Sequence, residues 1–365
     1  MGRLGPSTPL SGSRESPTIH TDGRPRAVPV DPRELARDLV RYRDPDPLRS
    51  WTELALTAGP LALLWMLAWA ALARDWWWGL LLTIPAAAFL VRLFMIQHDC
   101  GHGAFFRRRA TNDWVGRVAG VLTLTPYDCW RRLHASHHAG SGNLERDAFG
   151  GIETLAVADY LALSWPRRLR YRLFRHPLVQ LGLGPAYLFL LQQRVPFGLM
   201  RKGWRPWGSA MGTNLAFVGF AAAGAALFGA KAFLLAYFVT LMLAATAGVW
   251  LFYVQHQFER TFWARDADWD LHVAALHGSS YYDLPQPLRW FTADIGVHHV
   301  HHLNSRIPFY RLREVLRDRP ELATCGRLGL IESVRSVRLA LWDEETGRLI
   351  AFRDLRGRAT SSPAA

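Results

Sequence analysis

Four long apolar stretches constrain the fold of this chain more than any other feature of its sequence. They cover residues 51–73, 76–97, 209–228 and 232–253, and each is about twenty residues long. At a rise of about 1.5 Å per residue, a helix of that length crosses a hydrocarbon core of roughly 30 Å. Short links join the stretches in pairs. The sequence therefore predicts an all-α membrane protein with four transmembrane helices arranged as two hairpins.

Two other apolar segments are not expected to cross the membrane. Residues 115–125 are too few to span it, so we expect them to be interfacial or re-entrant. Residues 178–197 contain two prolines and three glutamines, and we assign them to the membrane interface. A single crossing at this point would also move the later histidines to the opposite side of the membrane.

The polar segments complete the domain organisation. We expect three regions, which are a flexible N-terminal tail at 1–50, a membrane domain at 51–320 with a cytosolic helical cap at 98–208 and 255–320, and a C-terminal cytosolic extension at 321–365. Within the tail, an early proline and the sequence that follows it favour a short helix at 32–42. Within the extension, residues 338–352 alternate around a Glu-Thr-Gly turn, which predicts a small β-hairpin.

The charge distribution predicts the orientation of the chain. A net charge of +13 first suggests nucleic-acid binding. The basic runs flank the apolar stretches, however, so we expect contact with anionic membrane lipids and no nucleic acid. The hairpin links carry only Arg74 and Lys231 as cations, and the positive-inside rule then places both termini and the histidine-rich segments in the cytoplasm. The expected location is the plasma membrane, which in a bacterium is the inner membrane.

Most of the 14 histidines fall in three motifs. The first, at 98–102, has two histidines four residues apart, and the motifs at 134–138 and 298–302 have histidines at i, i+3 and i+4. On a helix, residues at these spacings share a face, and imidazole is a good ligand for iron, copper, zinc and nickel. Eight imidazoles exceed what one metal ion can use, so the pattern indicates two ions. The predicted ligands are His98, His102, His134, His137, His138, His298, His301 and His302.

The remaining histidines are distinguished by their positions. His256 lies at the end of the last apolar stretch, and an ionisable residue at a membrane border indicates function, so we predict it as a ninth ligand. His299 falls off the face shared by its neighbours and is expected to support a ligand or to be structural. Isolated histidines are expected to be ordinary surface or core residues, and these are His20, His176, His272 and His277.

Acidic residues help to define the class of metal site. Soluble di-iron proteins use Glu-x-x-His motifs on bundle helices, and this chain contains no such motif. We therefore expect a site dominated by histidine. Four acids near the motifs either orient ring nitrogens or are solvated or helix-capping residues, and these are Asp99, Asp128, Asp147 and Glu259.

The motifs HDCGH, HASHH and HHVHH resemble those of the integral-membrane fatty acid desaturases, as do a QHQFE before the third motif and an LNSRIPFYRL after it. The resemblance covers roughly residues 50–320. The four-residue spacing of the first motif is similar to that of acyl-lipid desaturases acting at the Δ12 (ω-6) or ω-3 position. One departure is Ala293-Asp294, where similar sequences often have Gly-Asn.

The resemblance implies an O2-dependent acyl-lipid desaturase that introduces a cis double bond, with the Δ12 (ω-6) position expected. It also implies two iron ions held by the nine histidines and a fatty acyl substrate. A separate electron donor, a ferredoxin or a cytochrome b5-like protein, is expected because the chain lacks a His-Pro-Gly-Gly haem motif and a Gly-x-Gly-x-x-Gly fingerprint. Four aromatic residues either line a substrate tunnel or simply pack in the core, and these are Phe94, Trp130, Trp250 and Phe252.

Three alternative functions stay open. A related membrane di-iron hydroxylase, epoxygenase or carotenoid ketolase would use the same motifs. A membrane metal-binding or transport protein would place its ligands along a path through the membrane, whereas these clusters lie at the ends of the apolar stretches and between them. A lipid-binding sensor with the same fold would have no need of eight ligands.

Overall fold

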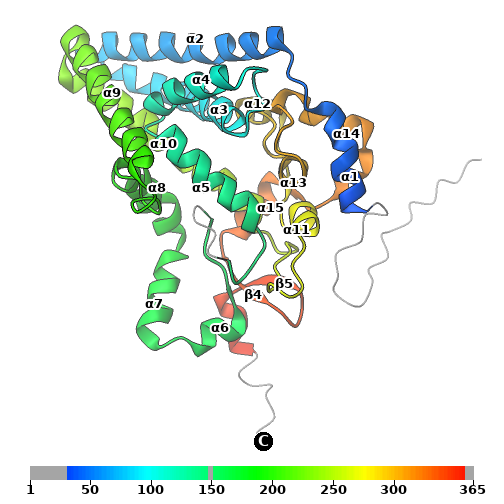
Figure 1. Cartoon of the computed structure of the whole chain (residues 1–365). Helices are drawn as coiled ribbons and strands as arrows, with labels where there is room; N and C mark the ends of the chain where they lie inside the picture. Colours follow the sequence, from blue (N-terminus) through cyan, green and yellow to red (C-terminus); the bar gives the residue numbers. More distant parts are fainter. Residues whose placement is uncertain (1–30, 147–150, 358–365) are drawn as a thin grey trace, which may run out of the picture.

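The computed structural model describes residues 31–146 and 151–357 (Figure 1). Within these ranges, four helices are long and apolar enough to cross a membrane, as the four apolar stretches predict. They are α2 (Pro47–Leu72), α3 (Thr83–His102, preceded by the 3-10 helix η2, Trp77–Leu82), α9 (Trp204–Phe228) and α10 (Ala230–His256). The chain is an all-α membrane protein whose described β-strands are short.

The two helical hairpins turn at the same end of the bundle. Lys231 Nζ at the α9–α10 link lies 3.1 Å from Asp75 Oδ1 at the α2–α3 link, so the two tips are in contact. At the other end, α3 and α10 continue beyond the predicted spans and end at His102 and His256. This extension places histidines at the end of the bundle opposite the hairpin tips.

Aromatic side chains fill the space between the two hairpins. The rings of Trp69 on α2 and Phe233 on α10 are 5.0 Å apart, and those of Trp65 and Tyr237 are 5.7 Å apart. All four side chains are buried. A Cβ at Gly224 of α9 would lie 2.1 Å from the Phe233 ring, so glycine permits this close approach. Within a membrane, such packing rather than hydrophobic burial holds helices together.

An ion pair lies buried between α2 and α3. Arg92 is 2% exposed, and its guanidinium lies 2.5 Å from the Glu53 carboxylate. Arg92 also donates to the carbonyl of Trp290 and lies 3.9 Å from the centre of the Trp290 ring. A charge in a membrane-spanning helix is costly unless it is paired. The network therefore holds α2 and α3 against α12 (Gln286–Phe291).

The N-terminal region differs from the sequence-based expectation from residue 31 onward. The predicted short helix is confirmed as α1 (Pro32–Asp38) and η1 (Leu39–Tyr42). The flexible-tail prediction is wrong for residues 31–50, because Leu35 and Leu39 are buried in the cap and the Tyr42 hydroxyl donates to Asp318 at 2.7 Å. Two leucines four residues apart are enough to bury one face of this short helix. The polar composition of the whole tail gave no sign of this buried face. Residues 1–30 lie outside the described part of the chain.

The segment at 178–197 contains only short helical pieces. The π-helix η3 (Val179–Leu183) leads into α8 (Gly184–Leu190) and the 3-10 helix η4 (Gln192–Arg194). None of these is long enough to cross a membrane. Exposed apolar side chains on this segment include Leu183 and Leu191.

The cap is built from short helices at the histidine end of the bundle (Figure 1). Helix α4 (Arg109–Leu122) and helix α5 (Tyr127–Gly140) pack against α3 and α9. The other helices are α6 (Val157–Ala162), α7 (Trp165–Phe174), α11 (Leu271–His277), α13 (His298–Leu303), η5 (Phe309–Arg311), α14 (Leu312–Asp318), η6 (Pro320–Thr324), α15 (Leu330–Ser336) and η7 (Phe352–Gly357).

Two small sheets complete the fold. Strands β4 (Leu339–Asp343) and β5 (Arg348–Ala351) pair antiparallel and confirm the predicted hairpin at 338–352. Strand β1 (Leu155–Ala156) joins β4 in parallel, which gives the order β1-β4-β5. Strands β2 (Tyr281–Asp283) and β3 (Arg327–Gly329) form a separate parallel pair.

Candidate metal centre

All nine predicted histidine ligands converge at the end of the bundle opposite the hairpin tips. They form two groups, and in each group one ligand nitrogen per residue lies within 4.8 Å of all the others. The five-histidine group contains His98, His102, His134, His138 and His301. The four-histidine group contains His137, His256, His298 and His302. Both groups have the composition of a metal site, because imidazole binds first-row transition metals well.

The groups do not follow the sequence motifs. Histidines four residues apart stay together, as in His134 and His138 on α5, whereas His137 belongs to the other group. The same holds on α13, where His298 and His302 share a group and His301 does not. Successive helical residues are about 100° apart, so His137 and His138 point in clearly different directions. The prediction that a motif presents one shared face is therefore wrong for the second and third motifs, whereas His98 and His102 of the first motif share a group.

The spacing of the nitrogens fits metal coordination. In the five-histidine group, the Nε2 atoms of His102 and His134, of His134 and His138, and of His138 and His301 are each 3.1 Å apart. With metal–nitrogen bonds of roughly 2.1 Å, ligands at a right angle are about 3.0 Å apart and tetrahedral ligands about 3.4 Å apart. The observed spacing is nearer that of ligands at a right angle.

The four-histidine group repeats this spacing. The Nε2 atoms of His137 and His256, of His256 and His298, and of His298 and His302 are also 3.1 Å apart. The rings of His138 and His302, one from each group, stack at 4.1 Å. The two groups therefore lie side by side and form one centre.

Hydrogen bonds between the imidazoles cannot pair all of these Nε2 atoms. A neutral imidazole nitrogen carries either one proton or one lone pair. His134 Nε2 has two Nε2 neighbours at 3.1 Å, so a single proton there can serve only one of them fully. His256 Nε2 is in the same position between His137 and His298. A cation at the centre of each group would turn the converging lone pairs into favourable contacts, so the residues fit a metal ion in each group.

In His98 and His256, the ring nitrogen that faces away from the other histidines contacts a neighbouring oxygen atom. His98 Nδ1 lies 3.1 Å from Asp99 Oδ1, and the other Asp99 oxygen accepts the backbone N–H of Phe309 at 2.7 Å. His256 Nδ1 lies 3.1 Å from the carbonyl oxygen of Gly278. Such contacts fix the ring orientation and leave Nε2 to face the centre.

Burial favours the neutral form of the cap histidines. Desolvation disfavours the imidazolium ion, and the neighbouring histidines in each group act in the same direction. Together these effects hold the pKa well below its usual value in His134, His137, His138, His298, His301 and His302. Neutral rings keep the lone pairs that a metal requires.

Three of the four candidate acids are not shown near a histidine. Asp128 accepts from Arg117 Nε at 2.9 Å, and Glu259 is exposed and lies 3.5 Å from Arg348. Of the two alternatives for these acids, the structure favours the one without a ring-nitrogen contact, because Asp128 and Glu259 each lie beside an arginine. Asp147 lies outside the described residues. Among the described candidate acids, Asp99 is the one that lies beside a ring nitrogen.

The other histidines lie outside both groups. His299 is fully buried beside the Tyr281 ring, and desolvation lowers its pKa to about 4. His176, His272 and His277 also join neither group, as predicted for isolated histidines. His20 lies outside the described residues.

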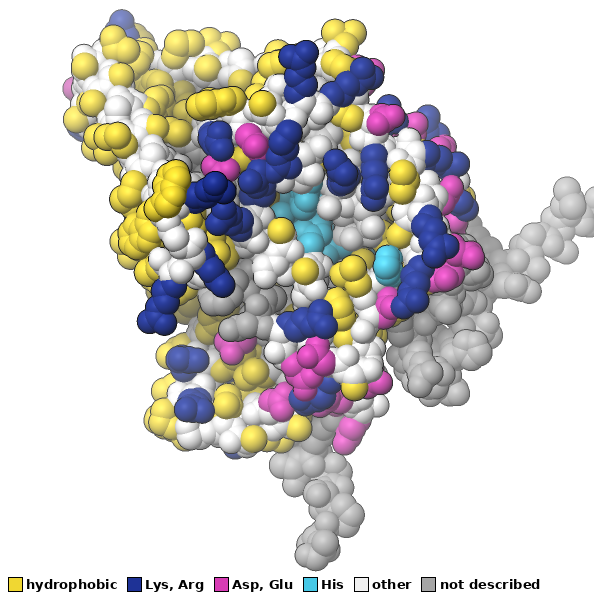
Figure 2. All heavy atoms as spheres, viewed as in Figure 1, with side chains coloured by type: hydrophobic (Ala, Val, Ile, Leu, Met, Phe, Trp, Pro, Cys, Tyr) yellow, Lys and Arg dark blue, Asp and Glu magenta, His cyan; other side chains and the backbone are white. Residues whose placement is uncertain are grey.

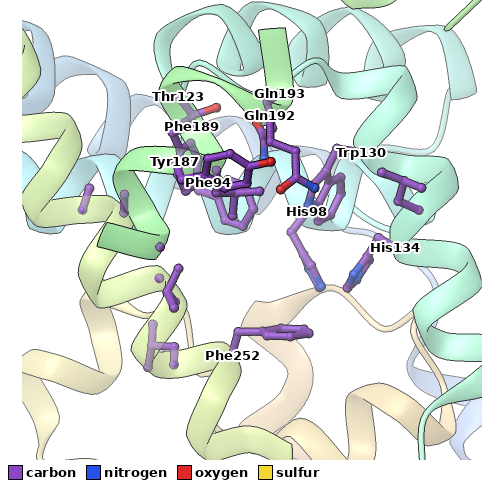
Figure 3. Close-up of a pocket in the computed structure, with 18 of the residues that line it drawn as sticks. Phe94, His98, Thr123, Trp130, His134, Tyr187, Phe189, Gln192, Gln193 and Phe252 are labelled. Atoms are coloured by element: carbon purple, nitrogen blue, oxygen red, sulfur yellow. The ribbon is translucent and has the colours of Figure 1, made fainter. Parts of the chain in front are cut away.

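An apolar cavity of about 620 Å³ reaches both histidine groups from the bundle. It lies between α3, α5, α10 and the segment at 178–197, and His98, His134 and His298 form part of its wall. Phe94, Trp130 and Phe252 line it, as Figure 3 shows. The Trp130 ring stacks on His134 at 4.5 Å. Trp250 does not line the cavity, because its indole N–H donates to the Tyr282 hydroxyl at 3.4 Å.

Comparison with known proteins identifies the family to which this chain belongs. The family model for fatty acid desaturases matches residues 75–331, which include all nine histidines. The chain belongs to the fatty acid desaturase family. A fatty acid desaturase of Bacillus subtilis is 38% identical over 331 residues, which cover 91% of this chain and 94% of the relative.

Two Synechocystis desaturases have more specific descriptions. An sn-1 acyl-lipid omega-3 desaturase (ferredoxin) is 30% identical over 282 residues, covering 74% of each chain. An sn-1 oleoyl-lipid 12-desaturase is 28% identical over 288 residues, covering 73% of this chain and 74% of the relative. This protein is therefore an oxidoreductase of the fatty acid desaturase type, with relatives described as acting on acyl lipids.

Several residues of this desaturase's cavity were not identified from the sequence. Gln192, Gln193 and Thr123 bring polar atoms to one side of the apolar cavity (Figure 3). The Gln193 side-chain oxygen is buried without a hydrogen-bond partner. The sequence did contain a sign of this cavity. Residues at every fourth position of the segment all line it, and these are Gln180, Gly184, Leu188 and Gln192. From the sequence alone, the glutamines indicated only an interfacial segment.

Proposed function

We propose that the chain is an O2-dependent acyl-lipid desaturase that introduces a cis double bond at the Δ12 (ω-6) position. The observation that carries this proposal is the direct contact between the apolar cavity and both histidine groups. His98 and His134 belong to the five-histidine group and His298 to the four-histidine group, and all three line the cavity. A hydrocarbon chain in the cavity would lie against the metal centre along part of its length.

Two iron ions are the proposed cofactor, one in each group. The near-right-angle spacing of the nitrogens suits a metal of higher coordination number than tetrahedral zinc, and the donor set suits iron. When bound, the irons would supply the O2 activation needed to remove two hydrogens from adjacent methylene carbons, which no side-chain base can do.

The protein's own residues position the substrate and exclude water. The cavity wall is mostly apolar, so binding releases water from both the acyl chain and the wall. Trp130 stacks on His134, and Phe252 lies 5.0 Å from His137, so an aromatic ring covers each histidine group on the cavity side. These rings limit the ways in which a chain can approach the centre. The unpaired Gln193 oxygen and its neighbour Gln192 could contact a polar part of the lipid.

We propose that the metal centre and both termini face the cytoplasm, in the inner membrane of a bacterium. The hairpin tips carry few cations, and Lys231 is paired with Asp75. The opposite end carries the arginine-rich cap, as the positive-inside rule requires of the cytoplasmic side. Figure 2 shows histidine side chains in a hollow with Lys and Arg side chains around it.

The proposed electron donor is a separate acidic protein, a ferredoxin or a cytochrome b5-like carrier. The basic surface around the histidine hollow would steer an acidic carrier to the centre. One relative is described as using ferredoxin. The proposed Δ12 position rests on another relative, which is described as a 12-desaturase of oleoyl lipid.

The test is the fatty-acid profile of a bacterial host that makes no dienoic acid and expresses the chain with a ferredoxin and its reductase. We expect a new dienoic acid by gas chromatography–mass spectrometry of methyl esters, with its double bonds located by derivatisation. The His137→Ala variant should abolish it and the control His272→Ala should not, because His272 joins neither group. A hydroxy or epoxy acid would assign the related hydroxylase or epoxygenase chemistry instead.

A further inference from the structure

A second cavity lies between helices α4, α5 and α9. Its volume is about 740 Å³, and none of the nine ligand histidines lines it. Its wall combines charged residues of α4 and α5 with the first turns of α9, from Trp204 to Ala216. It is therefore distinct from the cavity that reaches the metal centre, and neither the fold nor the proposed reaction gives it a role.

The charge of this groove is strongly positive. Four arginines and one aspartate, Asp128, line it. Arg117 and Arg131 are neutralised in part, because Arg117 pairs with Asp128 at 2.9 Å and Arg131 with Asp113 at 2.7 Å. Arg132 and Arg205 are exposed and have neither an ion pair nor a hydrogen bond to any described residue. Two arginines on different helices are thus available to one anionic group.

The rest of the groove is apolar and shaped by small residues. Val118 and Val121 of α4 face Gly208, Gly212 and Ala216 of α9. A Cβ built at Gly212 would meet no atom within 4 Å, so this glycine leaves open space along α9. An inorganic anion would have no use for such a surface, whereas an acyl chain would cover it.

Aromatic side chains mark the groove as part of the membrane boundary. Trp204 of α9 is 77% exposed and Trp114 of α4 is 65% exposed, and both line the groove. Exposed tryptophans are typical of the interface between headgroups and hydrocarbon. Figure 2 shows Lys and Arg side chains gathered over the region where Figure 1 draws α4 and α5. Cationic, aromatic and apolar surfaces therefore follow one another as they do across a lipid monolayer.

We propose that this groove binds one anionic phospholipid of the bilayer. Arg132 and Arg205 contact its phosphate, and one acyl chain lies along Val118 and Gly212. The proposal does not rest on the reaction proposed above, because the groove shares no residue with the two histidine groups.

The bound lipid would support the second histidine motif. Arg132 lies two residues before His134 on α5, and the thiol of Cys129 on the same helix contacts the Pro206 carbonyl of α9 at 3.2 Å. A lipid that bridges Arg132 and Arg205 adds a second connection between these helices. Loss of the lipid should therefore loosen α5, which carries three metal ligands.

The test is a titration of the detergent-purified chain with dioleoyl phosphatidylglycerol, followed by native mass spectrometry. We expect one tightly bound lipid per chain. The double variant Arg132→Gln/Arg205→Gln should weaken binding roughly thirty-fold, since each arginine near a lipid phosphate contributes about a factor of five. The matched control Arg167→Gln/Arg170→Gln removes two exposed charges from α7, outside the groove, and should leave binding unchanged.

A second pair of variants tests the acyl groove. Gly212→Leu places a side chain in the groove at a position where a built Cβ meets no atom, and it should also abolish tight binding. Gly219→Leu, whose built Cβ likewise meets no atom, lies on α9 outside the groove and should not. Inorganic phosphate should not displace the lipid. Unchanged affinity in the double arginine variant would overturn the proposal. Wild-type affinity in folded Gly212→Leu would also overturn it, because the site would then bind headgroups alone.

Discussion

Filling the apolar cavity at Gly248 should block the substrate without touching the metal centre. Gly248 lines the cavity on α10, and a Cβ built there would meet no atom within 4 Å. It lies eight residues before His256, which is about 12 Å along the helix. An extended acyl chain covers that length in roughly nine methylenes, at about 1.3 Å each. A Gly248→Leu side chain would therefore occupy space well away from the histidines.

The expected magnitude follows from the methylenes that leucine displaces. Its four carbons replace about four substrate methylenes, and each buried methylene is worth about 0.8 kcal/mol. The loss of about 3 kcal/mol raises the dissociation constant of a chain that fills the cavity by roughly 200-fold. Helix stability should not fall, because leucine has a higher helix propensity than glycine by about 0.8 kcal/mol.

The assay is desaturation of defined acyl lipids in liposomes, with products quantified by gas chromatography–mass spectrometry and bound metal measured in the same sample. We expect KM to rise while the metal content stays at the wild-type value. Gly59→Leu is the matched control, since Gly59 is exposed on α2 and also has no atom within 4 Å of its built Cβ. A folded Gly248→Leu enzyme with the wild-type KM would refute the assignment of this cavity to the acyl chain.

Three further predictions concern the centre and its surroundings. His256→Ala should reduce bound iron from two ions per chain to one by elemental analysis, whereas His272→Ala should retain both. Asp99→Asn should weaken metal binding roughly ten- to a hundred-fold in a chelator competition, because the carboxyl oxygen that contacts His98 Nδ1 is replaced by an amide group. Burial raises the pKa of Asp294 from 3.8 to about 6, so the folded state loses stability as pH rises between these values. Asp294→Asn should therefore raise the melting temperature more at pH 8 than at pH 5, and an equal gain at both would contradict this cause.

The histidine spacing predicts which histidines come together but not how they are grouped. Three motifs and His256 identify all nine residues that converge in the structure. The division of a motif between two groups depends on how α5 and α13 are rotated and placed against α3 and α10. That arrangement arises from long-range packing, which the spacing within one helix does not contain. The same limit explains Glu259, which is near a ligand in sequence but faces Arg348.

The structure shows the backbone conformation at Ala293-Asp294, where similar sequences often have Gly-Asn. Both residues have positive φ, at 53° and 51°. Glycine and asparagine adopt this region more readily than alanine, which accounts physically for the Gly-Asn of similar sequences. The turn leads to α13 and its three ligands, so its conformation bears on the position of the third motif.

The membrane architecture follows from the sequence more directly than the cavity does. Four apolar stretches of the right length predict four helices, and the structure has four candidate spans among its described residues. The cavity depends on the shape of residues 178–197, where the π-helix η3 passes directly into α8 at Gly184 and the helix ends at Leu190. Composition could place that segment at the interface but could not show which of its sides faces the metal centre.

A single-turnover reaction tests the central claim most directly. The chain would be loaded with iron, fully reduced without oxygen, freed of reductant, and then exposed to O2 in nanodiscs of oleoyl lipid. A chain with two ferrous ions holds two electrons, which together with two from the substrate C–H bonds reduce one O2 to two waters. The account predicts up to one dienoic acyl group per chain and none in His137→Ala. Iron-loaded, folded wild-type protein that forms no dienoic product would contradict it.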